Sequence, residues 1–100
     1  MTIKELIDKV IQLNKEGEKD KNKYQEVIDL LTDEVLKKEK SDILYTEKSE
    51  AYYQLGKFID SKNEAERALQ INPNNAKGNT YIGYYFDDQK DYAKAEEHYF

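Results

Sequence analysis

The sequence contains no cysteine and only one proline among its 100 residues. Without cysteine the chain can form neither disulfides nor Cys-ligated zinc sites, and it has no thiol nucleophile. Histidine occurs once, at His98, so a second histidine for a metal site is missing, as is the serine–aspartate arrangement of a catalytic triad. The acidic residues Asp87, Asp88 and Asp91 lack the glycine and the distal glutamate of an EF-hand loop. We therefore expect no enzymatic activity, no catalytic residue, no metal ion and no cofactor.

Long apolar runs are missing as well. Met1 leads into TIKELIDKVIQL, where charged residues interrupt the apolar pairs, so we expect neither a signal peptide nor a membrane span. The net charge is −5, from 16 basic and 21 acidic residues, and the two signs are interleaved. A basic stripe that would indicate nucleic acid or an anionic membrane as partner is absent. The expected location is cytoplasmic, which the lack of cysteine fits.

Apolar residues recur at helical spacing along the chain, and no stretch alternates in the way of a half-buried strand. This pattern predicts an all-α fold of six helices. The first begins after Thr2, which forms a capping box with Glu5, and stops near Gly17. The other helices are expected at residues 24–38, 42–55, 58–71 and 76–86 and from residue 92 onward, with turns at residues 18–23 and 87–91.

The single proline, Pro73, marks a joint between two helices. Proline pushes the preceding residue out of the α region, so the fourth helix should end at Asn72. Asn74 or Asn75 then becomes the N-cap of the next helix. A second capping-box pattern, Ser61 with Glu64, favours a later start for the fourth helix, but the repeat described next outweighs it.

One interval of 34 residues relates aromatic, turn and small residues along the chain. Tyr24, Phe58 and Tyr92 keep this interval. The small residues Ser49 and Gly83 keep it on the first helix of each hairpin, as Ser61 and Ala95 do on the second. Small side chains there should let the paired helices approach closely.

The period and the residue classes resemble the tetratricopeptide repeat (TPR) family, in which helix-turn-helix units stack into a right-handed superhelix. The matching residues are Gly56, Phe58, Ser61, Ala68, Leu69 and Pro73 in residues 42–75, and Ile82, Gly83, Phe86, Asp91, Tyr92, Ala95 and Tyr99 in residues 76–100. Residues 2–41 match more loosely. The resemblance implies one domain, residues 1–100, built of about three hairpins that act as a non-catalytic protein-binding scaffold.

In such a superhelix one stripe of the first helices lines the concave surface. The resemblance places there the partner-binding residues Thr46, Glu50, Tyr53, Lys77, Thr80, Tyr84 and Asp87. Tyrosine suits a binding surface, because it combines a large apolar ring with a hydroxyl and few rotamers. Tyr52, Tyr81 and Tyr92 are expected to pack between helices, whereas Tyr84 fits packing and binding equally well.

Some members of the family clamp the acidic C-terminal tail of a chaperone. The corresponding positions here are Thr46, Glu47, Glu50, Lys77 and Tyr81. Only Lys77 has the matching charge and the glutamates would repel a carboxylate, so an extended peptide with basic or apolar side chains is the expected partner. The alternative is an assembly fragment that packs against further repeats or a second copy. The short last helix favours this alternative, because it leaves the C-terminal end open to a longer array or to self-association.

Overall fold

A computed structural model describes the backbone of residues 1–99 and the side chains of residues 1–89. Within residues 1–99 it contains six helices and no strand, which confirms the all-α prediction. The helices are α1 (Ile3–Glu16), α2 (Asn22–Leu30), α3 (Asp33–Glu39), α4 (Asp42–Gln54), α5 (Phe58–Ile71) and α6 (Ala76–Tyr99). The predictions that concern the side chains of Asp91, Tyr92, Ala95, His98 and Tyr99 lie outside the described residues.

Helix α1 begins and ends as its sequence predicts. The Thr2 hydroxyl accepts a hydrogen bond from the Glu5 amide at 3.1 Å, and the Glu5 carboxylate accepts one from the Thr2 amide at 3.2 Å. At the other end the Tyr24 ring packs directly on Gly17. A Cβ atom on Gly17 would lie 2.3 Å from Cε1 of that ring, so α2 can approach α1 this closely only because Gly17 has no side chain.

The prediction of one helix over residues 24–38 is wrong, because the chain breaks between α2 and α3. Leu31 leaves the helical region with φ −96° and ψ 62°, and its side chain is fully buried. Thr32 then caps α3 by accepting a hydrogen bond from the Val35 amide at 3.3 Å. Burial of Leu31 and the capping of a new helix compensate for the helical hydrogen bonds that the break removes.

Helices α4 and α5 form the hairpin that the repeat predicts. Gly56 makes the turn with φ 79°, a conformation that glycine adopts without strain. The Ser49 hydroxyl donates to the Ser61 carbonyl at 2.7 Å, and the two hydroxyls lie 3.0 Å apart. These buried serines confirm a close helix contact. Helix α5 starts at Phe58, so the capping-box pattern of Ser61 and Glu64 does not begin it.

The joint around Pro73 is confirmed. Helix α5 ends at Ile71, and Asn72 is extended. The Asn75 side chain accepts a hydrogen bond from the Gly78 amide at 2.8 Å, which makes Asn75 the N-cap of α6. The Asp42 carboxylate accepts hydrogen bonds from the side-chain amides of Asn72 at 3.0 Å and Asn75 at 2.8 Å. The start of α4 is thereby tied to the joint.

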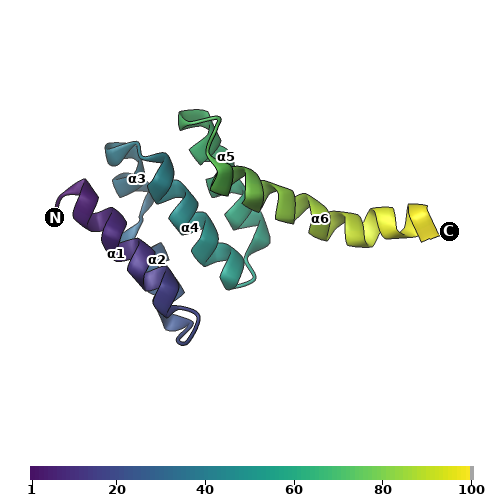
Figure 1. The fold of residues 1–100 in the computed structure, drawn as a ribbon, viewed down its shortest axis with the longest axis horizontal. Helices are drawn as coiled ribbons and strands as arrows, with labels where there is room; N and C mark the ends of the chain where they lie inside the picture. Colours follow the sequence, from purple (N-terminus) through teal and green to yellow (C-terminus); the bar gives the residue numbers. More distant parts are fainter. Residues whose placement is uncertain (100) are drawn as a thin grey trace.

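The predicted turn at residues 87–91 is wrong, because α6 is continuous from Ala76 to Tyr99. Its N-terminal part packs on α4 and α5, and its C-terminal part projects away from the other helices (Figure 1). Residues 87–91 contain neither glycine nor proline, so nothing local ends the helix. Among the described residues nothing lies within 4 Å of a Cβ atom built on Gly83, so the close helix approach predicted at Gly83 is not found. The longest dimension is 54 Å.

Helix α4 lies at the centre of the fold and contacts α1, α2, α5 and α6 (Figure 1). Every residue from Leu44 to Ser49 is buried, including polar and charged ones. A helix that is covered on most of its faces loses the simple amphipathic pattern of a surface helix. The buried apolar core comprises Val10, Leu13, Tyr24, Val27, Leu31, Leu36, Leu44, Tyr45, Ala51 and Ala68.

Candidate functional site

A polar network joins α1, α4 and the first turns of α6. Glu47 and Glu50 project from neighbouring turns of α4, three residues apart. The Lys77 ammonium of α6 lies 2.7 Å from Glu47 Oε2 and 3.1 Å from Glu50 Oε1. The Tyr81 hydroxyl, one turn further along α6, donates to Glu50 Oε1 at 3.0 Å. Two carboxylates therefore share one cation where α6 docks on α4.

Asn14 of α1 completes the network from the opposite side. Its amide nitrogen donates to Glu47 Oε1 and to the Glu47 carbonyl, both at 3.0 Å. The side chain is only 4% exposed, and its carbonyl oxygen has no hydrogen-bond partner among the described residues. Beside it lies a pocket of about 190 Å³, here called the acidic pocket. Its lining residues are Ile11, Asn14, Lys15, Glu18, Tyr24, Glu47, Glu50, Gln54 and Lys77.

The pKa values of Lys77, Tyr81 and Tyr24 are all raised, so these hydrogen-bond donors stay protonated. Burial by itself lowers the pKa of Lys77, but the hydrogen bond to Glu47 and the charges of Glu47 and Glu50 outweigh it and raise that pKa. Burial also raises the pKa of Tyr81, and the Glu50 carboxylate raises it further. Burial raises the pKa of Tyr24, with the charges of Glu18 and Glu50 adding to the effect. The contributions of the Glu18, Glu47 and Glu50 carboxylates to these shifts indicate a negative potential in the pocket.

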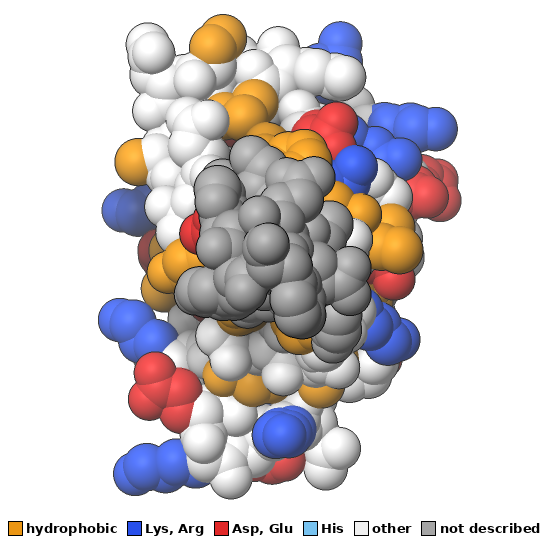
Figure 2. All heavy atoms as spheres, turned by 90° about the vertical axis from the view of Figure 1, so that its right-hand side faces the viewer, with side chains coloured by type: hydrophobic (Ala, Val, Ile, Leu, Met, Phe, Trp, Pro, Cys, Tyr) orange, Lys and Arg blue, Asp and Glu red, His pale blue; other side chains and the backbone are white. Residues whose placement is uncertain are grey.

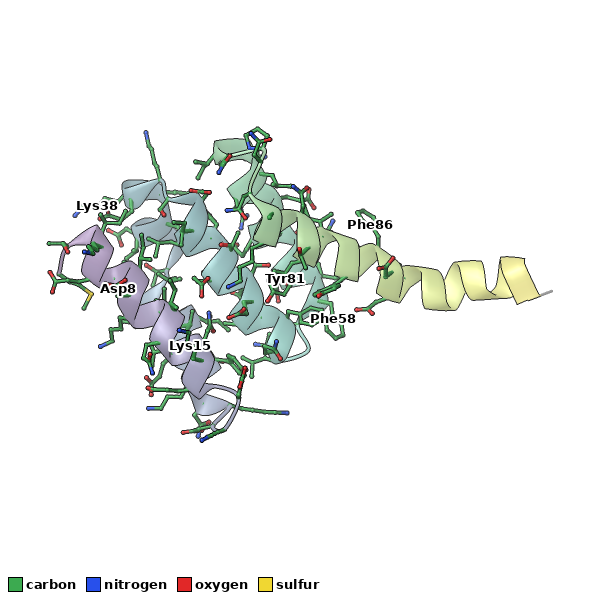
Figure 3. All side chains as sticks on the ribbon, viewed as in Figure 1. Asp8, Lys15, Lys38, Phe58, Tyr81 and Phe86 are labelled. Carbon is green, nitrogen blue, oxygen red and sulfur yellow. The ribbon has the colours of Figure 1, made fainter. Side chains whose placement is uncertain are left out.

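Next to the acidic pocket four aromatic rings form what we call the aromatic cluster: Tyr53, Phe58, Tyr81 and Tyr84. The ring of Tyr53 lies 5.2 to 5.4 Å from each of the other three, measured between centroids, within the range of favourable aromatic pairs. Tyr81 is buried, whereas Phe58 is 41% and Tyr84 44% exposed. Figure 3 shows Tyr81 and Phe58 on one side of α6 and Phe86 on the other. The cluster thus has a buried base and an open apolar rim.

The predicted partner-binding residues divide into two groups. Four of them, Glu50, Tyr53, Lys77 and Tyr84, belong to the acidic pocket or the aromatic cluster. Thr46 is only 2% exposed and donates its hydroxyl to the Ile43 carbonyl at 2.9 Å, so it does not reach the surface. Thr80 is exposed and donates its hydroxyl to the Ala76 carbonyl at 2.9 Å. Asp87 is exposed and is not among the lining residues of the acidic pocket.

The α1 side of the site has one signal in the sequence, which lies at Asn14. Asn14 follows Ile7, Val10 and Ile11 at helical spacing and therefore lies on the apolar face of α1. A polar residue at such a position must find a partner when it is buried. Of the packing predictions for tyrosine, that for Tyr81 is confirmed by its burial, and Tyr52 is partly buried.

A second buried carboxylate lies on the opposite side of α4. Glu64 of α5 is 4% exposed, pairs with Arg67 and leaves its Oε2 without a partner among the described residues. Burial raises the pKa of Glu64, although the charges of Lys48 and Arg67 oppose the effect. Glu64 does not line the acidic pocket, and we assign it to the packing of α4 against α5.

Comparison with known proteins gives no match, whether with family models, with curated proteins or with solved structures. Among the side chains of residues 1–89, no group of three or more His, Asp or Glu is placed to hold a metal ion. None of the helices in the described part of the chain combines the length and apolar character that a membrane crossing needs.

Proposed function

We propose that this protein is a non-catalytic scaffold of the TPR type, acting in the cytoplasm, which binds an extended segment of a partner protein. The 34-residue interval supports the TPR assignment, and so does the α4–α5 hairpin with its serine contact at the positions of small residues. The proposed binding surface is formed by α1, α4 and the first turns of α6. Neither nucleic acid nor membrane is part of the proposal, because the charges are interleaved and net acidic.

The observation that carries this proposal is the aromatic cluster. Tyrosine and phenylalanine rings that are packed at the base and open at the rim provide apolar contact area with little loss of side-chain entropy on binding. Tyr81 belongs to the cluster and also donates to Glu50 of the acidic pocket. An apolar anchor and an acidic group therefore adjoin on one surface, which suits a peptide with apolar and basic side chains.

The charges also oppose the binding of an acidic tail. A clamp for a carboxylate needs free cations, but Lys77 is already engaged by Glu47 and Glu50. A peptide carboxylate at this place would be repelled by both glutamates, which already share the single ammonium of Lys77. We therefore exclude the acidic chaperone tail from the proposed partners.

Fluorescence anisotropy with synthetic labelled peptides tests the proposal. Three probes are compared, in which leucine alternates with arginine, leucine alternates with glutamate, or glycine alternates with serine. We expect the leucine–arginine peptide to bind best and Tyr84→Ala to weaken it about tenfold, the effect of losing an interface anchor. Phe86→Ala is the matched control, because Phe86 is exposed on the opposite side of the same helix. Equal binding of all three peptides, or equal losses in both variants, would refute the proposal.

Exposed apolar residues favour a second candidate, assembly with another copy of the chain. Hydrophobic side chains gather around the base of the projecting part of α6 (Figure 2). Ile59 and Phe86, at 61% and 52%, are among the exposed large apolar residues. Sedimentation over a range of concentrations tests this candidate, with Ile59→Lys as the disrupting variant. A monomer at all concentrations excludes self-assembly, whereas a dimer that Ile59→Lys dissociates supports it.

A further inference from the structure

We infer that the acidic pocket is a receptor for one arginine side chain of the bound peptide. The inference rests on the proposed function and specifies its chemistry. It depends on three features of the pocket: a buried acceptor without a partner, a surplus of negative charge, and a wall that suits a planar cation.

The buried acceptor is the side-chain carbonyl oxygen of Asn14. The orientation of this amide is fixed, because its nitrogen donates to both the carboxylate and the backbone carbonyl of Glu47. Turning the amide over would bring its oxygen against two other acceptors. The Asn14 oxygen is therefore the atom of this amide that has no partner among the described residues, in a side chain that lines the pocket and is 4% exposed. A buried acceptor of this kind is costly unless a donor reaches it.

The surplus charge follows from the lining residues. Three carboxylates, those of Glu18, Glu47 and Glu50, face two ammonium groups, those of Lys15 and Lys77. One negative charge is thus left over along the wall. Glu47 and Glu50 share the single ammonium of Lys77, so the surplus lies beside one buried carboxylate, that of Glu47, and one partly buried carboxylate, that of Glu50. A second cation would therefore be stabilised at this place.

Arginine matches these features better than lysine does. Its guanidinium offers five donors in one plane, and the pocket offers acceptors from Asn14, Glu50 and Gln54. The Tyr24 side chain also lines the pocket, and a guanidinium packs well on an aromatic ring. At about 190 Å³ the pocket has room for the planar head group, since one water takes about 30 Å³.

Neutral replacement of the guanidinium provides the test. Two labelled peptides that alternate leucine with serine are compared, one containing a single arginine and the other a single citrulline, which has nearly the same shape without the charge. In parallel, acetyl-argininamide and acetyl-citrullinamide are titrated into isotope-labelled protein, and the side-chain amide of Asn14 is followed by NMR. We expect the arginine peptide to bind about tenfold more tightly, because hydrogen bonds to a charged group are stronger than those to a neutral one. Only acetyl-argininamide should shift the Asn14 signal.

Two variants change the charge of the pocket in opposite directions. Glu50→Gln removes the surplus negative charge and should abolish the preference for arginine over citrulline. Lys77→Met removes the internal cation and should increase that preference. Lys62→Met is the matched control, because Lys62 pairs with Glu66 on α5, outside the pocket. Melting temperatures of all variants confirm that they are folded.

The outcomes separate this inference from the proposed function. If both peptides bind equally and acetyl-argininamide leaves the Asn14 signal unchanged, the pocket holds only water and the inference is wrong, while the scaffold proposal stands. If neither peptide binds but acetyl-argininamide shifts Asn14, the arginine pocket is supported and the peptide-binding proposal fails. A preference for arginine that survives Glu50→Gln would place the cation elsewhere and overturn the inference.

Discussion

The same substitution, glycine to alanine, should have opposite effects on stability at Gly17 and Gly83. At Gly17 the backbone is helical, with φ −59° and ψ −24°, so alanine causes no backbone strain and only its Cβ matters. That atom would lie 2.3 to 2.6 Å from three atoms of the Tyr24 ring. The ring is buried and cannot simply swing away. Overpacking of this kind costs about 1–3 kcal/mol, and the reduced entropy of the unfolded chain returns about 0.4–1 kcal/mol.

Gly17→Ala should therefore lower the free energy of unfolding by about 1–2 kcal/mol. Gly83 lies inside α6, and a Cβ there meets nothing within 4 Å among the described residues. Alanine is a better helix former than glycine by about 0.8–1 kcal/mol, so Gly83→Ala should stabilise the protein by up to that amount. The difference in sign arises from tertiary contacts alone.

Urea unfolding followed by far-ultraviolet circular dichroism measures both effects. For a chain of this size, 1 kcal/mol corresponds to a change in melting temperature of about 4–8 °C. A Gly17→Ala variant as stable as the parent would refute the packing of Tyr24 on Gly17. A destabilised Gly83→Ala variant would mean that another helix packs against Gly83, as the 34-residue repeat predicts. The continuous α6 would then be refuted.

Three further substitutions test the helix contacts. Leu69 of α5 packs on α6, where a Cβ atom on Gly78 would lie 3.4 Å from Leu69 Cδ2. Leu69→Ala should cost about 2 kcal/mol in urea unfolding, the lower end of the range for leucine because this side chain is only partly buried. A change within about 0.5 kcal/mol would contradict this contact. Burial raises the pKa of Glu64, so the folded state keeps a proton that the unfolded chain loses above pH 4.5. The free energy of unfolding should therefore fall as the pH rises from 4.5 to the pKa of Glu64 in the folded state. Glu64→Gln should remove this dependence in unfolding curves measured at several pH values. Asp42→Ala should cost about 1 kcal/mol by freeing the amides of Asn72 and Asn75. Burial by itself raises the pKa of Asp42, but the hydrogen bonds outweigh burial and lower that pKa. The contribution of Asp42 to stability is therefore present above pH 3.8 and is lost as the pH falls through the pKa of the folded state.

The helices that the sequence predicts well are those with local signals at their ends. Thr2 caps α1, Gly56 turns the chain between α4 and α5, and Pro73 separates α5 from α6. The spacing of apolar residues does not reveal the break between α2 and α3. Leu31 is apolar at a position where a continuous helix would also have an apolar residue, so the helical period continues through the break. The reason for the break is tertiary, namely the burial of Leu31 in the core.

Helix α6 shows the opposite conflict. The repeat predicts a turn near Asp87, whereas the local sequence from Asp87 to Asp91 has no residue that ends a helix. In the structure the local preference prevails. A repeat indicates which hairpins a family forms, but whether the chain turns at a given place still depends on the residues at that place.

The candidate site was predicted only in part. Glu50, Tyr53, Lys77 and Tyr84 follow from the register of the repeat, which is clear in the sequence of residues 42–100. Asn14 does not follow from this register, because residues 2–41 match the repeat only loosely. The pairing of Lys77 with two glutamates could not be read from the sequence, since it depends on how far α6 approaches α4.

The two candidate functions use different parts of the structure and can be separated. The acidic pocket and the aromatic cluster draw on α1, α4, the start of α5 and the part of α6 that ends at Tyr84. All of these residues come before Asp87 in the chain, so neither group uses a side chain from the projecting part of α6. Assembly instead depends on exposed apolar residues such as Phe86 and on the projecting part of α6. Substitutions on the assembly surface, such as Ile59→Lys, should therefore leave peptide binding unchanged.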